Sequence, residues 1–244
     1  MKGGVKSGVR NVWAVAAREL RSYFLSPLAY VVIALFLALA GYLFALILAN
    51  GREASLRGLV QNVSVLYLFI VPAISMRLLA EEQRTGTIEL LLTNPVQEWE
   101  IVTGKFLASV MLVLVMLGLT LLFPLFLFIY GNPDRGPIVT GYLGIFLQSA
   151  AFLAVGLWAS SLTQNQIVAA IVAFALLLIL WLSDNLGQFL GGTIGSIVSY
   201  TSVINHFQSF PQGVVQSNDV IYYLSLVLAG IVLSTLSLQS RRYR

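Results

Sequence analysis

Residues 136–183, "GPIVTGYLGIFLQSAAFLAVGLWASSLTQNQIVAAIVAFALLLILWLS", contain no Asp, Glu, Lys or Arg over 48 consecutive positions. An α-helix needs about 20 apolar residues to cross the roughly 30 Å hydrocarbon core of a bilayer. The stretch is therefore long enough for two crossings, and the polar segment "SSLTQNQ" at 160–166 separates them. This pattern predicts two membrane-spanning helices joined by a short loop.

The same pattern continues outward in both directions. Runs without a charged residue also cover 22–51, 58–76, 106–133 and 220–240. Only 10% of the residues are charged and 58% are hydrophobic, which is too little charge to cover the surface of a soluble domain. We predict an all-α membrane protein whose six transmembrane helices lie near 28–50, 60–80, 104–130, 138–160, 166–184 and 220–239.

The basic residues predict the orientation of these spans. An even number of spans puts both termini on one side, and eleven basic residues then share that side: Lys2, Lys6, Arg10, Arg18, Arg21, Arg77, Arg84, Lys105, Arg241, Arg242 and Arg244. Only Arg52, Arg57 and Arg135 lie opposite. Because short cytoplasmic loops carry the excess of Lys and Arg, we expect both termini in the cytoplasm of a bacterial inner membrane. The net charge of +4 is then explained by topology and lipid headgroups, so no nucleic-acid partner is expected.

We predict that the chain is divided into two regions, a cytoplasmic N-terminal region over 1–27 and a six-span domain over 28–244. Within the first, residues 9–26 have apolar side chains at helical spacing, with Arg18, Glu19 and Arg21 among the polar ones. This pattern favours a helix lying along the inner membrane surface over a plain extension of the first span. We expect Pro27 to end that helix.

Residues 185–219 form an unusual region before the last span. It has no charge between Asp184 and Asp219, yet it is interrupted by Gly187, Gly191, Gly192, Gly195 and Pro211. Half-helices that re-enter the outer leaflet fit this pattern best. The region includes His206, Phe207, Gly213 and Asp219. His206 is the only histidine and the chain has no cysteine, so we expect a hydrogen-bonding role with no acidic residue nearby and no metal site.

The segment "EEQRTGTIELLLTNPVQEWE" at 81–100 contains five of the ten acidic residues. We predict that a turn at Gly86 follows the second span, that Thr87 caps a short helix "IELLLT", and that Pro95 ends it. This helix would present three adjacent leucines, 90–92, which need to be covered. Either the protein's own spans or a groove on a soluble partner could cover them, and composition leaves both open.

A family resemblance extends over most of the chain. "EEQRTGTIELLLTNPVQEWEIVTGK" resembles the loop between the second and third spans of ABC-2 type transporter permeases, and eleven positions match its pattern in order: Glu81, Glu82, Arg84, Gly86, Thr87, Glu89, Leu91, Leu92, Pro95, Gly104 and Lys105. "ARELRSYFLSPLAY" is similar to the interfacial elbow helix of the same family. "INHFQSFPQGVVQSNDVIYYLS" resembles the end of the branch that contains the gliding-motility permease subunit.

The resemblance implies that loop 81–103 carries a coupling helix docked on a cytoplasmic ABC ATPase. Two ATPase copies would serve a dimer of this chain with itself or with a related permease, and would power alternating access, most often for export. Glu81, Glu82, Arg84 and Glu89 would then orient the partner, and Leu91 and Leu92 would be buried against it. ATP and Mg would bind the partner, because this chain has no phosphate-binding loop at its Gly-Lys pair, "TGKF" at 103–106. Such a loop needs a Gly five positions before Gly104, where Trp99 stands, and a Ser or Thr after Lys105, where Phe106 stands. We expect no enzyme activity and no cofactor in this chain.

Two other classes of function are weighed against this one. An ion-coupled secondary transporter or channel usually has an acidic residue or a histidine in mid-membrane, whereas all ten acids here fall at predicted edges or loops. A permease-like scaffold for an envelope machine would use the same docking loop. The residues leave the cargo open, although few charges within the spans favour lipid-like cargo over small ions.

Overall fold

The computed structural model describes residues 2–51, 55–86 and 97–242, which form helices and no strand. Two helices open the chain, α1 (Lys2–Leu25) and α2 (Pro27–Gly51), and α3 (Arg57–Ser75) and the short α4 (Ala80–Thr85) follow. The central helices are α6 (Glu98–Thr120), α7 (Leu122–Tyr130), α8 (Arg135–Leu162) and α9 (Gln166–Leu190). The last elements are α10 (Gly192–Tyr200), α11 (Val203–Phe207), the 3-10 turn η1 (Phe210–Gln212) and α12 (Ser217–Arg242).

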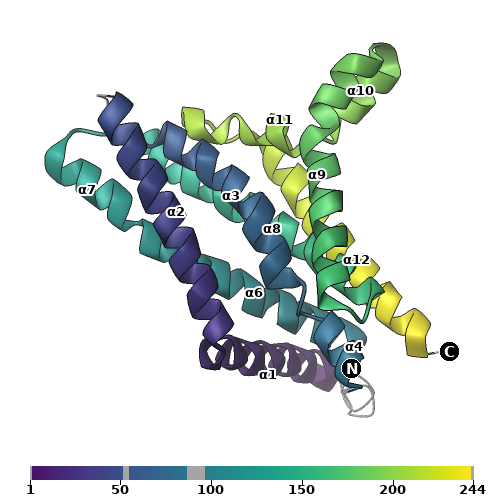
Figure 1. Ribbon diagram of the computed structural model, residues 1–244. Helices are drawn as coiled ribbons and strands as arrows, with labels where there is room; N and C mark the ends of the chain where they lie inside the picture. The colour runs from purple at the N-terminus through teal and green to yellow at the C-terminus, as the bar shows by residue number, and fades with distance from the viewer. Residues whose placement is uncertain (1, 52–54, 87–96, 243–244) are drawn as a thin grey trace.

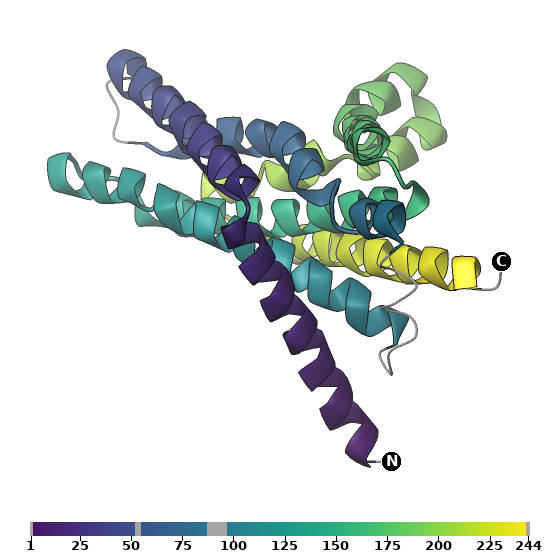
Figure 2. The ribbon, with the colours of Figure 1, turned by 60° about the horizontal axis from the view of Figure 1, so that its bottom comes forward.

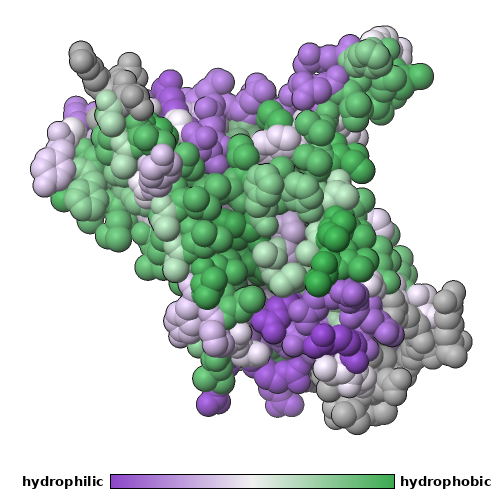
Figure 3. Space-filling view, viewed as in Figure 1, coloured by the Kyte–Doolittle hydropathy of each residue, from purple (hydrophilic) through white to green (hydrophobic). Residues whose placement is uncertain are grey.

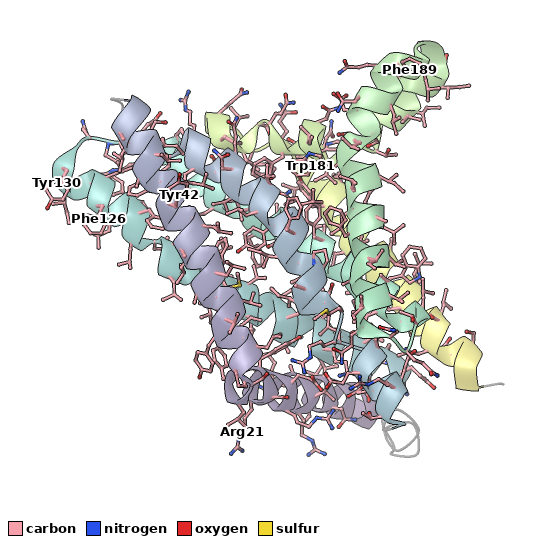
Figure 4. The ribbon with its side chains drawn as sticks, in the orientation of Figure 1. Arg21, Tyr42, Phe126, Tyr130, Trp181 and Phe189 are labelled. Carbon is pink, nitrogen blue, oxygen red and sulfur yellow. The ribbon has the colours of Figure 1, made fainter. Side chains whose placement is uncertain are left out.

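Six helical segments in the described ranges are long and apolar enough to cross a membrane, which confirms the predicted number. They cover 27–49, 57–85, 98–130, 135–162, 166–190 and 217–240. Figure 3 shows the matching surface, an apolar band between hydrophilic groups at the two ends of the molecule. Large aromatic side chains such as Tyr42, Phe126 and Tyr130 are exposed on α2 and α7 (Figure 4). The protein is therefore a multi-pass membrane protein.

The two ends of the bundle differ in the elements they carry (Figure 1). Helices α1 and α4 and both chain termini lie at one end, which we call the basal end. Helices α10 and α11 lie at the opposite, distal end. Figure 1 shows α1 lying across the base, turned away from the direction of α2, and with the base turned forward α1 extends beyond the spans (Figure 2). The chain turns between α1 and α2 at Ser26, and Pro27 begins α2.

The core forms around α3 and α8, each with 67% of its most apolar window buried, against 22% for α9 and α12. Small residues make α8 a close-packing surface. At the contact with α12, a side-chain carbon added to Gly230 would lie only 2.6 Å from the Ala154 carbonyl group. Transmembrane helices gain most of their association energy from such close packing, because lipid is as apolar as the helices. The remaining spans surround this pair and expose apolar side chains.

Two predicted span boundaries are wrong. The third span begins at Glu98 rather than 104, and its helix is interrupted at Leu121, between α6 and α7. Pro124 explains the interruption, since it has no N–H to bond the carbonyl of Thr120, which accepts instead from the Tyr142 hydroxyl at 2.9 Å. The fifth span continues past Asp184 to Leu190. Asp184 is accommodated there because Gln188 and Asn205 donate to its carboxylate, at 2.8 and 2.7 Å.

The region 185–219 contains the end of α9, the helices α10 and α11, and η1. Helix α10 packs back on α9 and projects beyond the rest of the bundle (Figure 1). Gly191 and Gly192 both have positive φ, 61° and 60°, so the reversal between the two helices uses backbone conformations that favour glycine. The region is helical but broken, and its re-entry into a membrane leaflet stays a prediction.

Candidate functional site at the basal end

A buried lysine joins three helices at the basal end. Lys105, on α6, is 2% exposed, and its Nζ lies 3.0 Å from Glu19 Oε1 on α1 and 2.8 Å from Glu82 Oε1 on α4. The side chains of Glu19 and Glu82 are 18% and 15% exposed. A buried cation is strongly disfavoured unless it is paired, so both carboxylates are needed to hold this ammonium group in place. The pairing ties α1, α4 and α6 together.

Two arginines extend this charged cluster, which comprises Arg18, Glu19, Arg77, Glu81, Glu82 and Lys105. Arg18 lies near both carboxylates, 3.2 Å from Glu19 and 3.5 Å from Glu82. Arg77 pairs one turn along with Glu81, Nε to Oε2 at 3.1 Å. Three acids and three bases thus lie together at the base of α3 and α6. The cluster is balanced in charge.

Helices α1 and α6 also contact each other along their length. Asn11 Nδ2 donates to Glu100 Oε2 at 3.1 Å, and the same carboxylate oxygen accepts from the Gln97 N–H at 3.0 Å at the start of α6. Gly104 lets the helices approach, since a side-chain carbon there would lie 2.7 Å from Val15 Cβ. Helix α1 is therefore fastened to the helix that follows residues 87–96, and to α4 on the other side of them.

A cavity of about 220 Å³ opens inside the charged cluster. Glu19, Tyr23, Arg77, Glu81 and Lys105 are among its lining residues. Desolvation raises the pKa of the Tyr23 hydroxyl, and the carboxylate of Glu19 adds to the effect. Tyr23 therefore stays neutral at physiological pH. The charges around the cavity are already paired with one another, so it offers no single-sign site for an ion.

The predicted docking residues are only partly within the described ranges. Glu81 and Glu82 lie on α4 together with the exposed Arg84, and Gly86 ends α4 with a left-handed φ of 71°. The resemblance assigns Glu82 to the partner, but in this structure its carboxylate contacts Lys105. The other five docking positions lie outside the described residues: Thr87, Glu89, Leu91, Leu92 and Pro95.

The three N-terminal residues singled out in the sequence have different surroundings. Arg18 and Glu19 belong to the charged cluster, whereas Arg21 is exposed and points away from the bundle (Figure 4). One face of α1 thus serves the cluster and another is left uncovered by this chain. That division fits an amphipathic helix, and the contact of α1 with a membrane surface stays a prediction.

The distal end holds a second polar cluster that the sequence did not predict. His206 Nδ1 lies 2.9 Å from Asp219 Oδ1, and its Nε2 lies 3.0 Å from the carbonyl oxygen of Tyr200. Ser209 donates to the other Asp219 oxygen at 2.5 Å. The expectation that no acidic residue lies near His206 is wrong, because the fold brings α11 against the first turn of α12. Residues 13 apart in a chain with turns between them have no fixed distance.

The other two distal residues of the prediction have packing roles. Phe207 is buried and its ring lies near that of Phe210, with centroids 6.2 Å apart. Gly213 ends η1 with φ 91° and lies against Pro137 of α8. Neither offers a reactive group. Within the described ranges, no three His, Asp or Glu side chains gather in a way that could hold a metal ion.

The pairing of Lys105 is the feature of this site that the sequence does not predict. In the sequence, Lys105 is one of the basic residues that indicate the orientation and the last position of the loop pattern. The local sequence offers one indication of this pairing, a single lysine beside a glycine at the start of an apolar run. A charge at that position needs a partner once the helix is packed.

Six apolar helices, an amphipathic N-terminal helix fastened beneath them and paired charges at the base of the second and third spans define a polytopic membrane protein. The chain belongs to the ABC-2 transporter family: the family model described as ABC-2 family transporter protein matches residues 13–240. A search of curated proteins finds no match to the chain. Membership makes this chain the membrane subunit of an ABC transporter and implies an ABC ATPase as partner.

Proposed function

We propose that residues 81–103 dock this permease subunit on a cytoplasmic ABC ATPase, and that ATP hydrolysis there drives alternating access for export. The observation that carries the proposal is the charged cluster. Lys105 lies on α6, just after the loop, and its ammonium group pairs with Glu82 on α4, at the start of the loop, and with Glu19 on α1. Helices α4 and α6, the two arms of the loop, therefore respond together with α1 to a force on the loop.

The mechanism follows from how rigidly these parts are connected. Movement of the docked loop is transmitted through α4 to α3, which forms the core part of the second span. The loop also continues directly into α6, which is the first part of the third span. Because α1 is held by the Lys105 ion pairs and by the close contact at Gly104, it follows the loop rather than staying behind. Helices move as rigid bodies more readily than they deform, so a push at the base becomes a tilt of two spans.

The remaining parts of the proposal concern assembly. We assign ATP and Mg to the ATPase, two copies of which serve a dimer of this chain with itself or with a related permease. The basal end then faces the bacterial cytoplasm, in keeping with the basic residues of α1 and with both termini at that end. The distal end faces outward.

Co-purification tests the docking directly. The chain is expressed with an ABC ATPase, sought by its Walker motifs among the neighbouring reading frames, and Leu91→Asp and Glu89→Arg are compared with wild type. We expect both variants to lose most of the bound ATPase while the chain itself folds, as judged by its elution as a single species. Val214→Asp, an equivalent change at an exposed distal position, is the matched control. Wild-type amounts of ATPase on both basal variants would refute the docking assignment.

A further inference from the structure

A cavity of about 310 Å³ lies at the distal end, where α3 and α9 meet the segment formed by α11 and η1. Its volume is at the lower end of the range for small-molecule sites, about 300–1,000 Å³. Figure 4 shows Trp181 on α9, one of the lining residues, close to α11. The docking loop is at the opposite end of the bundle, so the cavity belongs to a different part of the molecule.

Neutral amides and aromatic rings dominate the lining. Gln61 of α3 and Gln208 and Gln212 of the distal segment contribute carboxamides, and Trp181 and Phe207 contribute rings. Among the residues that the structure describes, no charged side chain lines the cavity. The three glutamines are exposed, and their side chains make no hydrogen bond to any described residue. Each amide can donate and accept, so together they suit a ligand with several uncharged polar groups.

The floor of the cavity also has unused hydrogen-bonding capacity. Ser64 lines it, is 1% exposed and donates to Gln148 Oε1 at 2.7 Å. Gln148 is completely buried, and its Nε2 has no partner among the described residues. Buried polar atoms in proteins almost always find a partner, so an unpaired amide next to a cavity-lining hydroxyl indicates that something else completes the network.

The distal segment is fastened from behind, which fixes its cavity face. His206 and Ser209 both bond Asp219, and the Tyr223 hydroxyl donates to the Val203 carbonyl at 3.0 Å. Thr140 donates to the Phe210 carbonyl at 2.6 Å. Phe207, Gln208 and Gln212 are therefore presented by a segment already held in place. Binding therefore need not order the backbone of this segment, and the conformational entropy that is lost is confined to the exposed glutamine side chains.

We propose that this cavity binds a sugar ring. A charged ligand would find no ion-pair partner among the described lining residues, and a purely apolar ligand would displace water from three amides without bonding them. A pyranose has an apolar C–H face that packs on an aromatic ring and a rim of hydroxyls that bond amides, which is the combination on the lining. The ring could belong to a free oligosaccharide or to the headgroup of a glycolipid. The proposal does not rest on coupling, because binding needs no ATPase.

Binding is measured on the full chain, purified in a detergent without a sugar headgroup and placed in phosphatidylcholine nanodiscs. The probes are maltose, lactose and chitobiose as free sugars, octyl maltoside below its micelle concentration as a sugar headgroup on an alkyl chain, and octylphosphocholine as a charged headgroup. Saturation-transfer NMR detects contact, and titration gives the Kd. We expect saturable binding of at least one sugar probe and none of octylphosphocholine.

Variants then locate the site. Gln208→Leu with Gln212→Leu removes two amides and leaves apolar side chains of comparable bulk, and we expect Kd to rise about tenfold or more. Gln216→Leu, the same change at an exposed position outside the cavity, is the control and leaves Kd unchanged. Equal melting temperatures for the variants and wild type exclude unfolding as the cause. Trp181→Leu gives a second variant in case the double change is unstable.

Each outcome decides the proposal. Binding of free sugars that the double variant loses supports it and identifies a soluble glycan. Binding of octyl maltoside alone, again lost in the variant, supports it and identifies a glycolipid headgroup. The proposal is overturned if no sugar probe saturates, if the variants bind as wild type does, or if octylphosphocholine binds as tightly as octyl maltoside.

Discussion

The two ends of this bundle stabilise their polar groups in different ways. At the basal end a lysine that is 2% exposed is held by two carboxylates from different helices. At the distal end one carboxylate, Asp219, gathers a histidine and a serine, and the surrounding groups are neutral amides and aromatic rings. The basal cluster joins helices that are distant in sequence. The distal cluster fastens a short segment to the start of the next helix.

This contrast separates two mechanical roles. Charge pairs between α1, α4 and α6 give a connection that costs much free energy to break, as suits parts that move together. Neutral side chains on a segment that Asp219 holds from behind give a cavity that a ligand can enter and leave without breaking an ion pair between helices. We therefore expect substitutions at the basal end to affect stability and ATPase coupling together, and those at the distal end to leave coupling intact.

The largest effect should come from Lys105→Met. The change removes the buried cation between Glu19 and Glu82 and leaves the two carboxylates with only the largely exposed guanidinium of Arg18. Removing one partner of a buried pair costs about 3–5 kcal/mol, and partial solvent contact of these carboxylates brings our expectation to about 3 kcal/mol. Thermal unfolding in detergent measures the loss. Adding Glu19→Gln and Glu82→Gln should restore much of it, and a single variant as stable as wild type would show that the three charges do not form one unit.

Close packing at the basal end is tested by two alanines on the same helix. Gly104→Ala places a carbon 2.7 Å from Val15 Cβ and 2.9 Å from the Val12 carbonyl oxygen, so α1 must shift, at an expected cost of about 2 kcal/mol. Gly118→Ala meets nothing within 4 Å and should stabilise α6 by up to about 1 kcal/mol. Melting temperatures that fall equally in the two variants would contradict the close contact between α1 and α6.

The distal cluster predicts a smaller and more local effect. Asp219→Asn keeps the shape of the side chain but weakens its bonds to His206 and Ser209, at an expected cost of about 1.5 kcal/mol. Asp184→Asn, at a carboxylate that is less buried than that of Asp219 and also accepts two side-chain hydrogen bonds, should cost less than about 0.5 kcal/mol. Hydrogen exchange should rise in α11 of the first variant alone. Exchange rising instead at α1 or α4 would contradict the separation of the two ends.

Two neighbouring glutamates provide the finest comparison. The side chain of Glu82 is 15% exposed and bonded to Lys105, whereas that of Glu81 is 38% exposed and paired with Arg77 one turn away. We expect Glu82→Gln to lower the stability by about 1.5 kcal/mol and Glu81→Gln by less than about 0.5 kcal/mol. Denaturation of the two variants side by side measures the difference, and the reverse order would contradict the role of Glu82 within the cluster.

Much of the architecture could be predicted from the sequence because each membrane span requires a long run of apolar residues. The six spans follow from charge-free stretches alone, with no knowledge of their contacts. Boundaries were less predictable where a charge is bonded within the fold. Asp184 was interpreted as the end of a span, yet Asn205 and Gln188 bond it and the helix continues.

The clusters could not be predicted in the same way. Lys105 and Glu19 are 86 positions apart, and only the packing of α1 on α6 brings them within 3.0 Å. His206 and Asp219 are closer in sequence, but their contact depends on turns whose geometry no local pattern specifies. The family resemblance included Glu82 and Lys105 as separate positions in a pattern, and their pairing became evident only in three dimensions.

The central claim is that α1 and both arms of the docking loop move as one unit, and distances between spin labels test it most directly. The chain contains no cysteine, so spin labels attach only where a cysteine is introduced. We place them at Ala14→Cys on α1, Arg84→Cys on α4 and Gln212→Cys at the distal end. Retention of the ATPase by the Arg84→Cys variant is checked first. When ATP is added to the complex, we predict that the distance from α1 to α4 stays constant while the distance from α4 to Gln212 changes. A change between α1 and α4 as large as that across the bundle would contradict the account.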